Sequence, residues 1–302
     1  MSESLPAHPS DQITEAWRSH RPYLVNLAYQ MLGDIGDAED VAQEAFLRLS
    51  RTEAGEIDDV RGWLTVVAGR LCLDQVRSAR ARRERPADIN QDAVLANQPG
   101  QVDPADRVTL DDQVSGALLE VLSRLSPGER VAFVLHDVFE VPFDTIAQTV
   151  GRPVGTCRQL ARRARSKFAT GQPRFTEVAV AEHQLVTEKF ITACANGDLQ
   201  SLVAVLDPTV WGVGTVLAEP APPAQINHGQ QAVATNLLLY LGPGATLVTG
   251  PVGQPVVLAF AQRRLFAVIV LTIRDGLVTK IEATADPAAR FGAASGGLSA
   301  PR

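Results

Sequence analysis

The sequence has few cysteines, no long hydrophobic run and no overall excess of positive charge. Its three cysteines, Cys72, Cys157 and Cys194, lie far apart without a CxxC or Cys/His pattern, which argues against a disulfide scaffold or a zinc site. No stretch approaches the ~18 apolar residues that a membrane helix needs. The polar start MSESLPAHPSDQ lacks the pattern of a secretory signal. The sequence therefore predicts a cytoplasmic protein, with no metal and no cofactor.

The charge balance conceals two basic blocks. The 28 Lys and Arg residues are outnumbered by 34 Asp and Glu residues, for a formal net charge of −6, which by itself would argue against nucleic acid. Residues 70–85, however, contain six arginines and two acidic residues, and residues 151–168 contain five arginines, one lysine and no acidic residue. Such blocks are typical of surfaces that face phosphate groups.

The length and hydrophobic pattern indicate several domains. A chain of 302 residues, 45% hydrophobic and 21% charged, is typical of a globular protein of two or more domains. Helical spacing of apolar residues predicts a compact helical domain over 12–86. Gly33 and Gly36 are expected to separate its first two helices, with Asp37 capping the second. The pattern then dissolves, and a flexible linker is predicted over 87–110.

Two further domains follow. Helical spacing resumes at Val114 and predicts a second helical domain over 111–172, in which a short helix, a turn at Gly151 and a basic helix to Phe168 indicate a helix-turn-helix. Segment 176–291 begins with an apolar helix and then becomes rich in strands, with a hairpin turn at Asp275-Gly276. The predicted fold class is multidomain, with two all-α domains, an α+β domain and a mobile tail at 292–302.

The basic helix of the second domain carries side chains suited to reading DNA. Arginine can bond guanine bidentately in the major groove, and glutamine can pair with adenine. Leu160, Ala161 and Ala164 occupy the opposite face and can pack inward. The alternative is a solvated basic helix face. The candidate DNA-reading residues are Arg158, Gln159, Arg162 and Arg163.

The first basic block has a second explanation. Arg77, Arg80, Arg82 and Arg83 lie near the C-terminal end of a predicted helix that begins near Gly62. Basic side chains at that end also stabilise the helix dipole, so this block could serve the helix alone. Two basic elements separated by a linker nevertheless suggest a protein that touches DNA at two places.

These segments resemble a known family, the bacterial extracytoplasmic-function (ECF) group of RNA polymerase sigma factors. GDIGDAEDVAQEAFLRL (33–49) is similar to the family's region 2.2, and residues 58–86 are similar to regions 2.3 and 2.4. The segment that starts SPGERVAF resembles region 4 with its helix-turn-helix. The remainder, most clearly ACANGDLQSLVAVLDPTV (193–210), is similar to the SnoaL-like (NTF2-like) extension of actinobacterial sigma factors of the SigI and SigJ kind.

The resemblance implies a promoter-specificity subunit that binds core RNA polymerase and promoter DNA. Side chains of the second helix would contact the β′ clamp helices of the polymerase, and a plain solvated acidic face is the alternative. Trp63 is placed with the −10 group, although a Trp at helical spacing among Leu64, Val67 and Leu71 is more often a core residue. The implied sites are Asp37, Asp40, Gln43 and Glu44 for core polymerase, Arg61, Trp63, Asp74, Arg77 and Arg80 for the −10 element, and Arg158, Gln159, Arg162 and Arg163 for the −35 element.

For the C-terminal domain we expect regulation and no enzymatic activity. An anti-sigma partner, or contact of this domain with the sigma domains, would provide that regulation. Candidates for a catalytic site are Asp207, His228, Tyr240 and Asp286, which form no recognisable motif; His228 is expected in a loop before a helix. The apolar excess favours a packing surface.

Three alternatives remain at this point. The chain could be a helix-turn-helix regulator that acts without polymerase, which would bind duplex DNA tightly on its own. The C-terminal domain could be a cyclase-like or isomerase-like enzyme, which requires a pocket with a perturbed acid or base. Cys157, at the start of the basic helix, could be a redox switch, although a buried apolar role is the default for such a residue.

Overall fold

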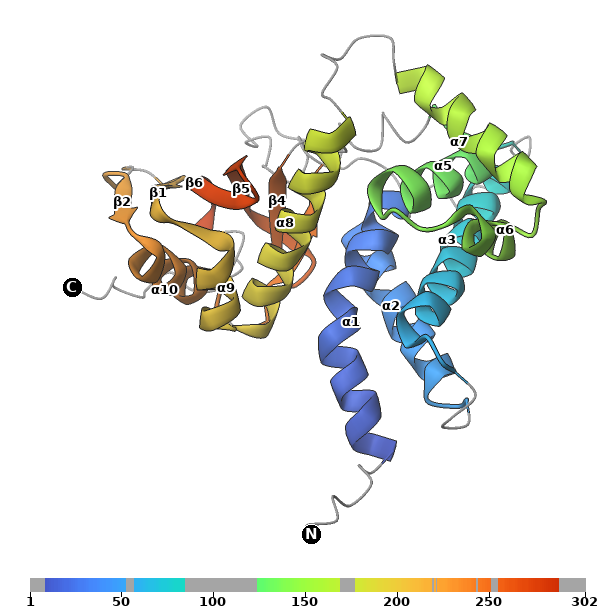
Figure 1. Ribbon diagram of the computed structural model, residues 1–302, viewed down its shortest axis with the longest axis horizontal. Helices are drawn as coiled ribbons and strands as arrows, with labels where there is room; N and C mark the ends of the chain where they lie inside the picture. The colour runs from blue at the N-terminus through green and yellow to red at the C-terminus, as the bar shows by residue number, and fades with distance from the viewer. Residues whose placement is uncertain are drawn as a thin grey trace, which may run out of the picture.

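The computed structural model describes residues 9–52, 57–84, 124–168 and 177–287, apart from 219, 221, 243 and 251–254. Figure 1 shows a sheet-containing domain beside a group of packed helices, with α8 and α1 facing each other between them. The predicted linker, residues 114–123 of the helix predicted from Val114 to Leu125, and the predicted tail at 292–302 lie outside the described residues; Arg124 and Leu125 lie in a turn before α5 and not in a helix. None of the described helices is long and apolar enough to cross a membrane.

Three helices form the N-terminal domain: α1 (Pro9–Leu32), α2 (Ile35–Leu49) and α3 (Val60–Glu84). The break between α1 and α2 lies at Gly33, which adopts a left-handed φ of 77°. The predicted cap was wrong, because the Asp34 carboxylate caps α2 by accepting a hydrogen bond from the Asp37 backbone N–H at 2.8 Å. Gly36 is also not part of the break, since it lies within α2.

The second group of helices is α5 (Pro127–Phe133), the π-helical turn η2 (Val134–Val138), α6 (Phe143–Val150) and α7 (Val154–Phe168). Ser126 and Glu129 form a reciprocal capping box at the start of α5, with Pro127 in its first turn. Gly151 ends α6 in the left-handed conformation, with a φ of 68°. The predicted short helix, glycine turn and basic helix are all present.

The C-terminal domain combines helices with one six-stranded sheet. Its helices are α8 (Glu177–Asn196), α9 (Leu199–Val205) and α10 (Gln230–Leu241). The strands are β1 (Leu206–Val216), β2 (Gln225–His228), β3 (Thr246–Thr249), β4 (Val256–Ala261), β5 (Arg264–Arg274) and β6 (Leu277–Ala285). Their order is β2-β1-β6-β5-β4-β3, and β1 and β6 are parallel while every other neighbouring pair is antiparallel.

The hairpin turn predicted at Asp275-Gly276 is present, whereas the loop predicted at His228 is not. Asp275 and Gly276 join β5 to β6 with positive φ values of 52° and 73°, as a tight hairpin turn requires. His228 ends strand β2, where it pairs with Trp211 of β1, and does not lie in a loop. The short polar segment QINH offered little strand signal by itself, and its pairing with β1 decides its conformation.

The helical domains and part of the sheet share one hydrophobic core. Apolar residues of α1, α2 and α3 pack with those of α5 and α6, and Val248, Leu258, Phe260 and Leu265 of the sheet domain join the same core. A separate core lies between the other face of the sheet and α8, α9 and α10. The sheet therefore packs on both faces, with its own helices on one side and α1 at the β3–β4 end of the other.

Candidate functional site

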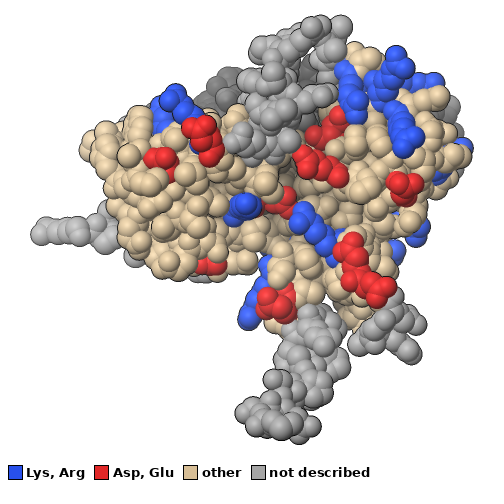
Figure 2. Space-filling model, viewed as in Figure 1, with Lys and Arg blue, Asp and Glu red and all other residues tan. Residues whose placement is uncertain are grey.

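Helix α7 presents the predicted DNA-reading side chains to solvent. Arg158, Gln159, Arg162 and Arg163 are all exposed, and Ala161 on the opposite side is fully buried. Figure 2 shows Lys and Arg side chains gathered over the end of the molecule where Figure 1 places α7. The arrangement provides a basic helix face of the kind that enters a major groove.

Other basic residues of α7 anchor the helix. Arg165 pairs with Asp137 of η2 at 2.5 Å, and Lys167 pairs with Glu129 of α5 at 2.7 Å. Although burial opposes ionisation of Glu129, hydrogen bonds from Lys167 and Ser126 keep its pKa below the usual value. The basic block is therefore divided between side chains that face solvent unpaired by an acid and side chains that pair with η2 and α5, a division that the sequence alone did not reveal.

The predicted −10 residues are spread along α3, whose rise of ~1.5 Å per residue separates Arg61 from Arg80 by about 28 Å. Asp74 and Arg77 are exposed and lie 3.9 Å apart, and Arg80 is exposed as well. Trp63 is half-buried and borders a hollow between α3 and α6, so it is neither a fully buried core residue nor a fully exposed one. The side chain of Arg83 lies outside the described residues.

Arg61 differs from the other predicted −10 residues because the C-terminal domain engages it. Its guanidinium group lies 2.6 Å from the Glu188 carboxylate of α8 and 4.1 Å from the centre of the Tyr23 ring. Cation–π contact and ion pairing both stabilise this position. In this arrangement the Arg61 guanidinium group is engaged by Glu188 and Tyr23 of the protein itself.

The predicted polymerase-binding face of α2 is also contacted by the sheet domain. Asp37, Asp40 and Gln43 are exposed, and the half-buried Glu44 pairs with Arg48 at 2.9 Å. Partial burial, together with the neighbouring carboxylates of Asp34 and Asp40, raises the pKa of Asp37. Arg263 donates a hydrogen bond of 2.6 Å to Asp40.

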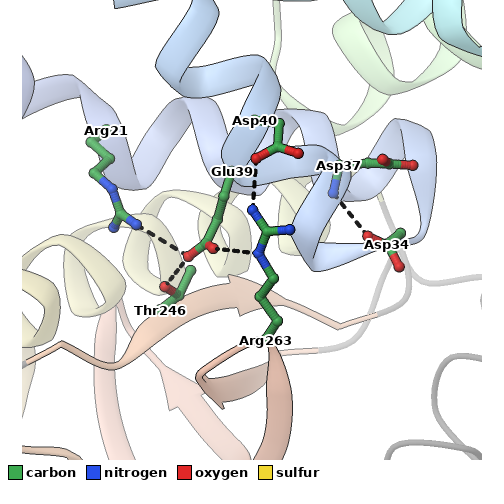
Figure 3. A network of polar contacts seen from close by, with 7 residues as sticks. All are labelled: Arg21, Asp34, Asp37, Glu39, Asp40, Thr246 and Arg263. Carbon is green, nitrogen blue, oxygen red and sulfur yellow. Dashed lines mark hydrogen bonds and ion pairs between the residues drawn. The ribbon is translucent and has the colours of Figure 1, made fainter.

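Figure 3 shows how this contact is built around Glu39, a residue that the sequence analysis missed. The Glu39 carboxylate pairs with the Arg21 guanidinium group at 3.2 Å and accepts a hydrogen bond of 2.7 Å from the Thr246 hydroxyl. The Arg263 guanidinium group lies 3.6 Å from the same carboxylate. Arg263 reaches α2 from the tight turn between β4 and β5, where its φ is 64°. A side chain on Gly36 would come within 2.9 Å of the Arg263 guanidinium, so this glycine leaves room for it.

Buried amides of α1 extend the interface. Gln30 donates to the Thr249 and Gly250 carbonyl oxygens at 2.6 and 3.1 Å, and Asn26 accepts from the Thr249 backbone N–H at 2.8 Å. Both amides are almost fully buried, at 1% and 4% exposure. Two amides within the apolar run YLVNLAYQML were the available sequence signal, because a buried amide requires a partner.

The two helical domains also contact each other directly. Arg70 of α3 donates to the Gln148 carbonyl oxygen at 3.0 Å, and Arg130 of α5 donates to the Met31 carbonyl oxygen at 3.1 Å. Gly69 lies against Thr149, so closely that a Cβ there would come within 2.6 Å of its methyl group. The predicted −10 and −35 surfaces therefore belong to one packed body in this structure.

The structure does not assemble a catalytic centre from the candidates in the C-terminal domain. Asp207 accepts hydrogen bonds from the Thr209 backbone and hydroxyl, and His228 is exposed at the end of β2. Tyr240 borders a hollow between α10 and the sheet, whereas Asp207, His228 and Asp286 do not. The described residues contain no cluster of His, Cys, Asp and Glu suited to a metal ion.

The cysteines are unsuited to reactivity. All three are free and buried, and burial raises the pKa of the Cys157 thiol. A thiol is nucleophilic as its thiolate, which burial disfavours. The packing role predicted as the default for Cys157 matches its burial between α7 and the rest of the helix-turn-helix.

Comparison with known proteins decides the family. Residues 16–82 match the family described as Sigma-70 region 2, and residues 115–168 match Sigma-70 region 4. A relative from Mycobacterium tuberculosis, named probable ECF RNA polymerase sigma factor SigI, is 49% identical over 289 residues, which cover 92% of this chain and 94% of the relative. The chain belongs to the ECF RNA polymerase sigma factors. The predicted family and function are thereby confirmed.

Further relatives of this sigma factor include ECF sigma factor SigJ of Mycobacterium tuberculosis, which is 35% identical over 90% of each chain. The crystal structure of SigJ is similar over 91% of this chain and 96% of that one, at 29% identity and a TM-score of 0.35. An NTF2-like protein of Burkholderia xenovorans is similar over 36% of the sigma factor and 93% of its own length, at 21% identity and a TM-score of 0.26.

Proposed function

We propose that the structure is a closed state of this sigma factor, in which the C-terminal domain restrains the surfaces that act in transcription initiation. As an ECF sigma factor the protein binds core RNA polymerase and promoter DNA. The observation that carries the proposal is that the sheet domain engages one predicted residue from each region 2 surface. Arg263 binds Asp40 of the polymerase-binding group, and Glu188 binds Arg61 of the −10 group.

The proposal includes the division of the chain and its site residues. Region 2 spans 12–86 and region 4 spans 111–172, joined by the linker 87–110; the regulatory domain spans 176–291 and the tail 292–302. Asp37, Asp40, Gln43 and Glu44 contact the β′ clamp helices. Arg61, Trp63, Asp74, Arg77 and Arg80 contact the −10 element, and Arg158, Gln159, Arg162 and Arg163 contact the −35 element. The protein acts in the cytoplasm, where polymerase and promoters are found, and its C-terminal domain acts by contact and not by catalysis.

Packing between the helical domains supports a closed state. The −35 and −10 elements are separated by about two helical turns of DNA, or ~70 Å. Helices α3 and α6 are in direct contact, so regions 2 and 4 cannot lie at both elements without separating. Core polymerase would stabilise the separated arrangement, because a ligand shifts an equilibrium toward the state that it binds better.

In vitro transcription with core polymerase tests the proposal. Arg263→Glu reverses the charge that faces Asp40 and Glu39, and Arg264→Glu makes the same charge change at an exposed neighbour on β5. We expect Arg263→Glu to lower the sigma concentration that gives half-maximal transcription, and Arg264→Glu to leave it unchanged. A chain truncated after residue 172 should show the same gain or a larger one.

Two results would contradict the closed state. If Arg263→Glu and the truncated chain were no more active than the full chain, the C-terminal domain would not restrain initiation. If both were less active in spite of intact folding, as judged by circular dichroism, the domain would assist initiation.

A further inference from the structure

A groove that is open to solvent lies between region 2 and the C-terminal domain, bordered by α1, α3, α8 and α9. Its volume of about 600 Å³ is in the range of small-molecule sites, ~300–1,000 Å³. Figure 1 shows α8 facing α1, with α9 directly after α8. The lining side chains of α8, from Leu185 to Asn196, recur at helical spacing and therefore form one stripe along the helix.

The acidic groups in the groove already have partners. The Glu188 carboxylate lies 2.6 Å from the Arg61 guanidinium group, so these two charges compensate each other. Asp198 accepts hydrogen bonds from the hydroxyl and the backbone N–H of Ser201, which lower the pKa of its carboxyl. A cationic ligand would therefore have to compete with contacts that the protein makes by itself.

Two basic groups in the groove, by contrast, have no hydrogen-bond or ion-pair partner among the described residues. They are the exposed Lys189 ammonium group and the half-buried His20 imidazole. Burial and the Arg61 charge lower the pKa of His20 in spite of Asp59, so the imidazole is neutral near pH 7 and one of its nitrogens can donate a hydrogen bond. Asp198 lies beyond the end of α8, ~10 Å along the helix from Lys189, a distance comparable with the screening length in physiological salt. Lys189 is therefore a positive charge without an acidic partner of its own.

Apolar surface lies beside this charge. Leu185 is 55% exposed and precedes Lys189 by one helical turn, so both side chains lie on the same stripe of α8. The exposed Ala204 and the buried Val205, both of α9, extend the apolar lining. An apolar group placed against these side chains would be removed from water, which is favourable in proportion to the area covered. The groove thus combines apolar walls with a few unpaired donors, a combination typical of ligand sites.

We infer that this groove binds a small amphipathic organic anion, with its negative group at Lys189 and His20 and its apolar part against Leu185 and Ala204. A charge-assisted hydrogen bond from Lys189 would orient the anion. Because His20 belongs to region 2 whereas Lys189, Leu185 and Ala204 belong to the C-terminal domain, the ligand bridges the two domains. A ligand that binds the assembled groove favours the closed state, and this consequence, unlike the binding itself, rests on the function proposed above.

Three probes that share a naphthalene ring test the binding on the full chain by calorimetry. The carboxylate 2-naphthoate and the ester 2-naphthyl phosphate are anions, whereas 2-naphthamide has nearly the shape of the carboxylate and no charge. We expect each anion to bind at least fivefold more tightly than the amide, and more tightly than inorganic phosphate, which lacks an apolar part. Equal binding of the anions and the amide, or no detectable binding of either anion, would overturn the inference.

Charge variants distinguish this groove from the basic helices. Lys189→Gln removes the unpaired charge of the groove and should weaken 2-naphthoate binding at least fivefold, while 2-naphthamide binding should change less than twofold. Arg274→Gln removes a positive charge from the exposed end of β5, outside the lining, and should leave the binding of both probes unchanged. If the two variants weaken 2-naphthoate binding equally, the anion binds through overall charge; if neither weakens it, the site lies elsewhere.

A second pair of variants tests the apolar part of the groove without a change of charge. Ala204→Leu places a larger side chain in the groove and should weaken 2-naphthoate binding at least fivefold. Ala195→Leu is its control, since Ala195 is an exposed residue of α8 outside the lining. Alanine and leucine both favour helices, so both variants should fold. Equal binding of 2-naphthoate by the two variants would contradict the placement of its ring.

Transcription separates this inference from the closed state. The probe 2-naphthoate should raise the concentration of the full chain that gives half-maximal transcription, and it should not affect the chain truncated after residue 172, which lacks α8 and α9. Binding in the groove without any effect on transcription by the full chain would contradict the bias toward the closed state and leave the site in place. Absence of binding would remove the site, and the Arg263→Glu result would still decide the closed state.

Discussion

Arg263 and Asn26 both connect the sheet domain to region 2, yet their surroundings differ. Arg263 is about half exposed, at 54%, and its ion pairs with Asp40 and Glu39 are open to screening by water and salt. Asn26 is 4% exposed and pairs with the backbone and side chain of Thr249. Buried hydrogen bonds are costly to leave unmade, so the amides of α1 should contribute more to the stability of the interface than the exposed ion pairs.

Replacing Asn26 tests this comparison. Asn26→Leu leaves the partly buried Thr249 N–H without its side-chain acceptor, which should cost about 1–3 kcal/mol in the free energy of the first unfolding transition in urea. Arg263→Ala should change that transition less and should lose its effect at high salt. A larger effect of Arg263→Ala than of Asn26→Leu would contradict this ranking.

Glu129 makes region 4 sensitive to acid. Lys167 and Ser126 lower its pKa in the folded protein, so its contribution to stability is fully present above the unfolded pKa of ~4.3 and is lost as pH falls through the lower folded value. We expect thermal melts of the full chain to show a decline in region 4 stability below about pH 4.3. In Glu129→Gln the stability at neutral pH should be lower and this part of the acid decline absent. An unchanged pH profile would show that Glu129 does not contribute.

Among the elements, α7 combines two tasks along one helix. Its buried side, with Cys157, Ala161 and Ala164, packs against the domain, and its last turn is anchored through Arg165 and Lys167. Such anchoring fixes the orientation of the exposed face, which is what base recognition requires. The proposed readout of the −35 element therefore depends on both sides of the helix.

A specificity experiment addresses α7. Arg162→Ala should lower transcription from a promoter with the preferred −35 sequence by about 10- to 100-fold, and should relax the preference at one base position. Arg152→Ala removes an exposed arginine of the preceding turn and should affect all promoters equally or not at all. If Arg162→Ala weakened every −35 variant by the same factor, Arg162 would contact phosphate and not a base.

At the scale of the whole molecule, the sheet domain packs on α1 of region 2 and region 4 packs mainly on α3, while Gln184 of α8 also donates a hydrogen bond of 3.3 Å to the Asp137 carbonyl oxygen of η2. Helix α1 contacts β3 and α8, and α3 contacts α5 and α6. One contiguous core runs through regions 2 and 4 and the β3–β4 end of the sheet. In the proposed closed state, separating regions 2 and 4 for promoter binding would expose the apolar side chains of this shared core to water. Opening would therefore cost free energy in proportion to the apolar area exposed.

Energy transfer between two dyes can measure that opening. Ser78→Cys on α3 and Ser166→Cys on α7 introduce exposed thiols, and the three native cysteines are buried and should not be labelled. We expect transfer to be efficient in the isolated protein and to fall when core polymerase and promoter DNA are added, as the dyes approach a separation of ~70 Å. Unchanged transfer in an active complex would exclude separation of regions 2 and 4.

Local physics explains why much of the fold could be predicted from the sequence. Apolar spacing gave the helices of both sigma domains, Gly151 gave the turn before α7, and Asp275-Gly276 gave the β5–β6 hairpin, because each depends on near neighbours in the chain. The exposed face of α7 followed from the same periodicity. The cap of α2 was misassigned because Asp34 and Asp37 are both suitable by type, and only backbone geometry distinguishes them.

The sequence by itself determined the helical sigma domains, the helix-turn-helix and the family to which the chain belongs, since motif and periodicity are local properties. Tertiary structure alone decided which partners the polar residues acquire. The pairing of Glu39 with Thr246, of Arg263 with Asp40 and of Arg61 with Glu188 joins residues more than a hundred positions apart. The groove between α1 and α8 likewise depends on the packing of two domains, which no single segment specifies.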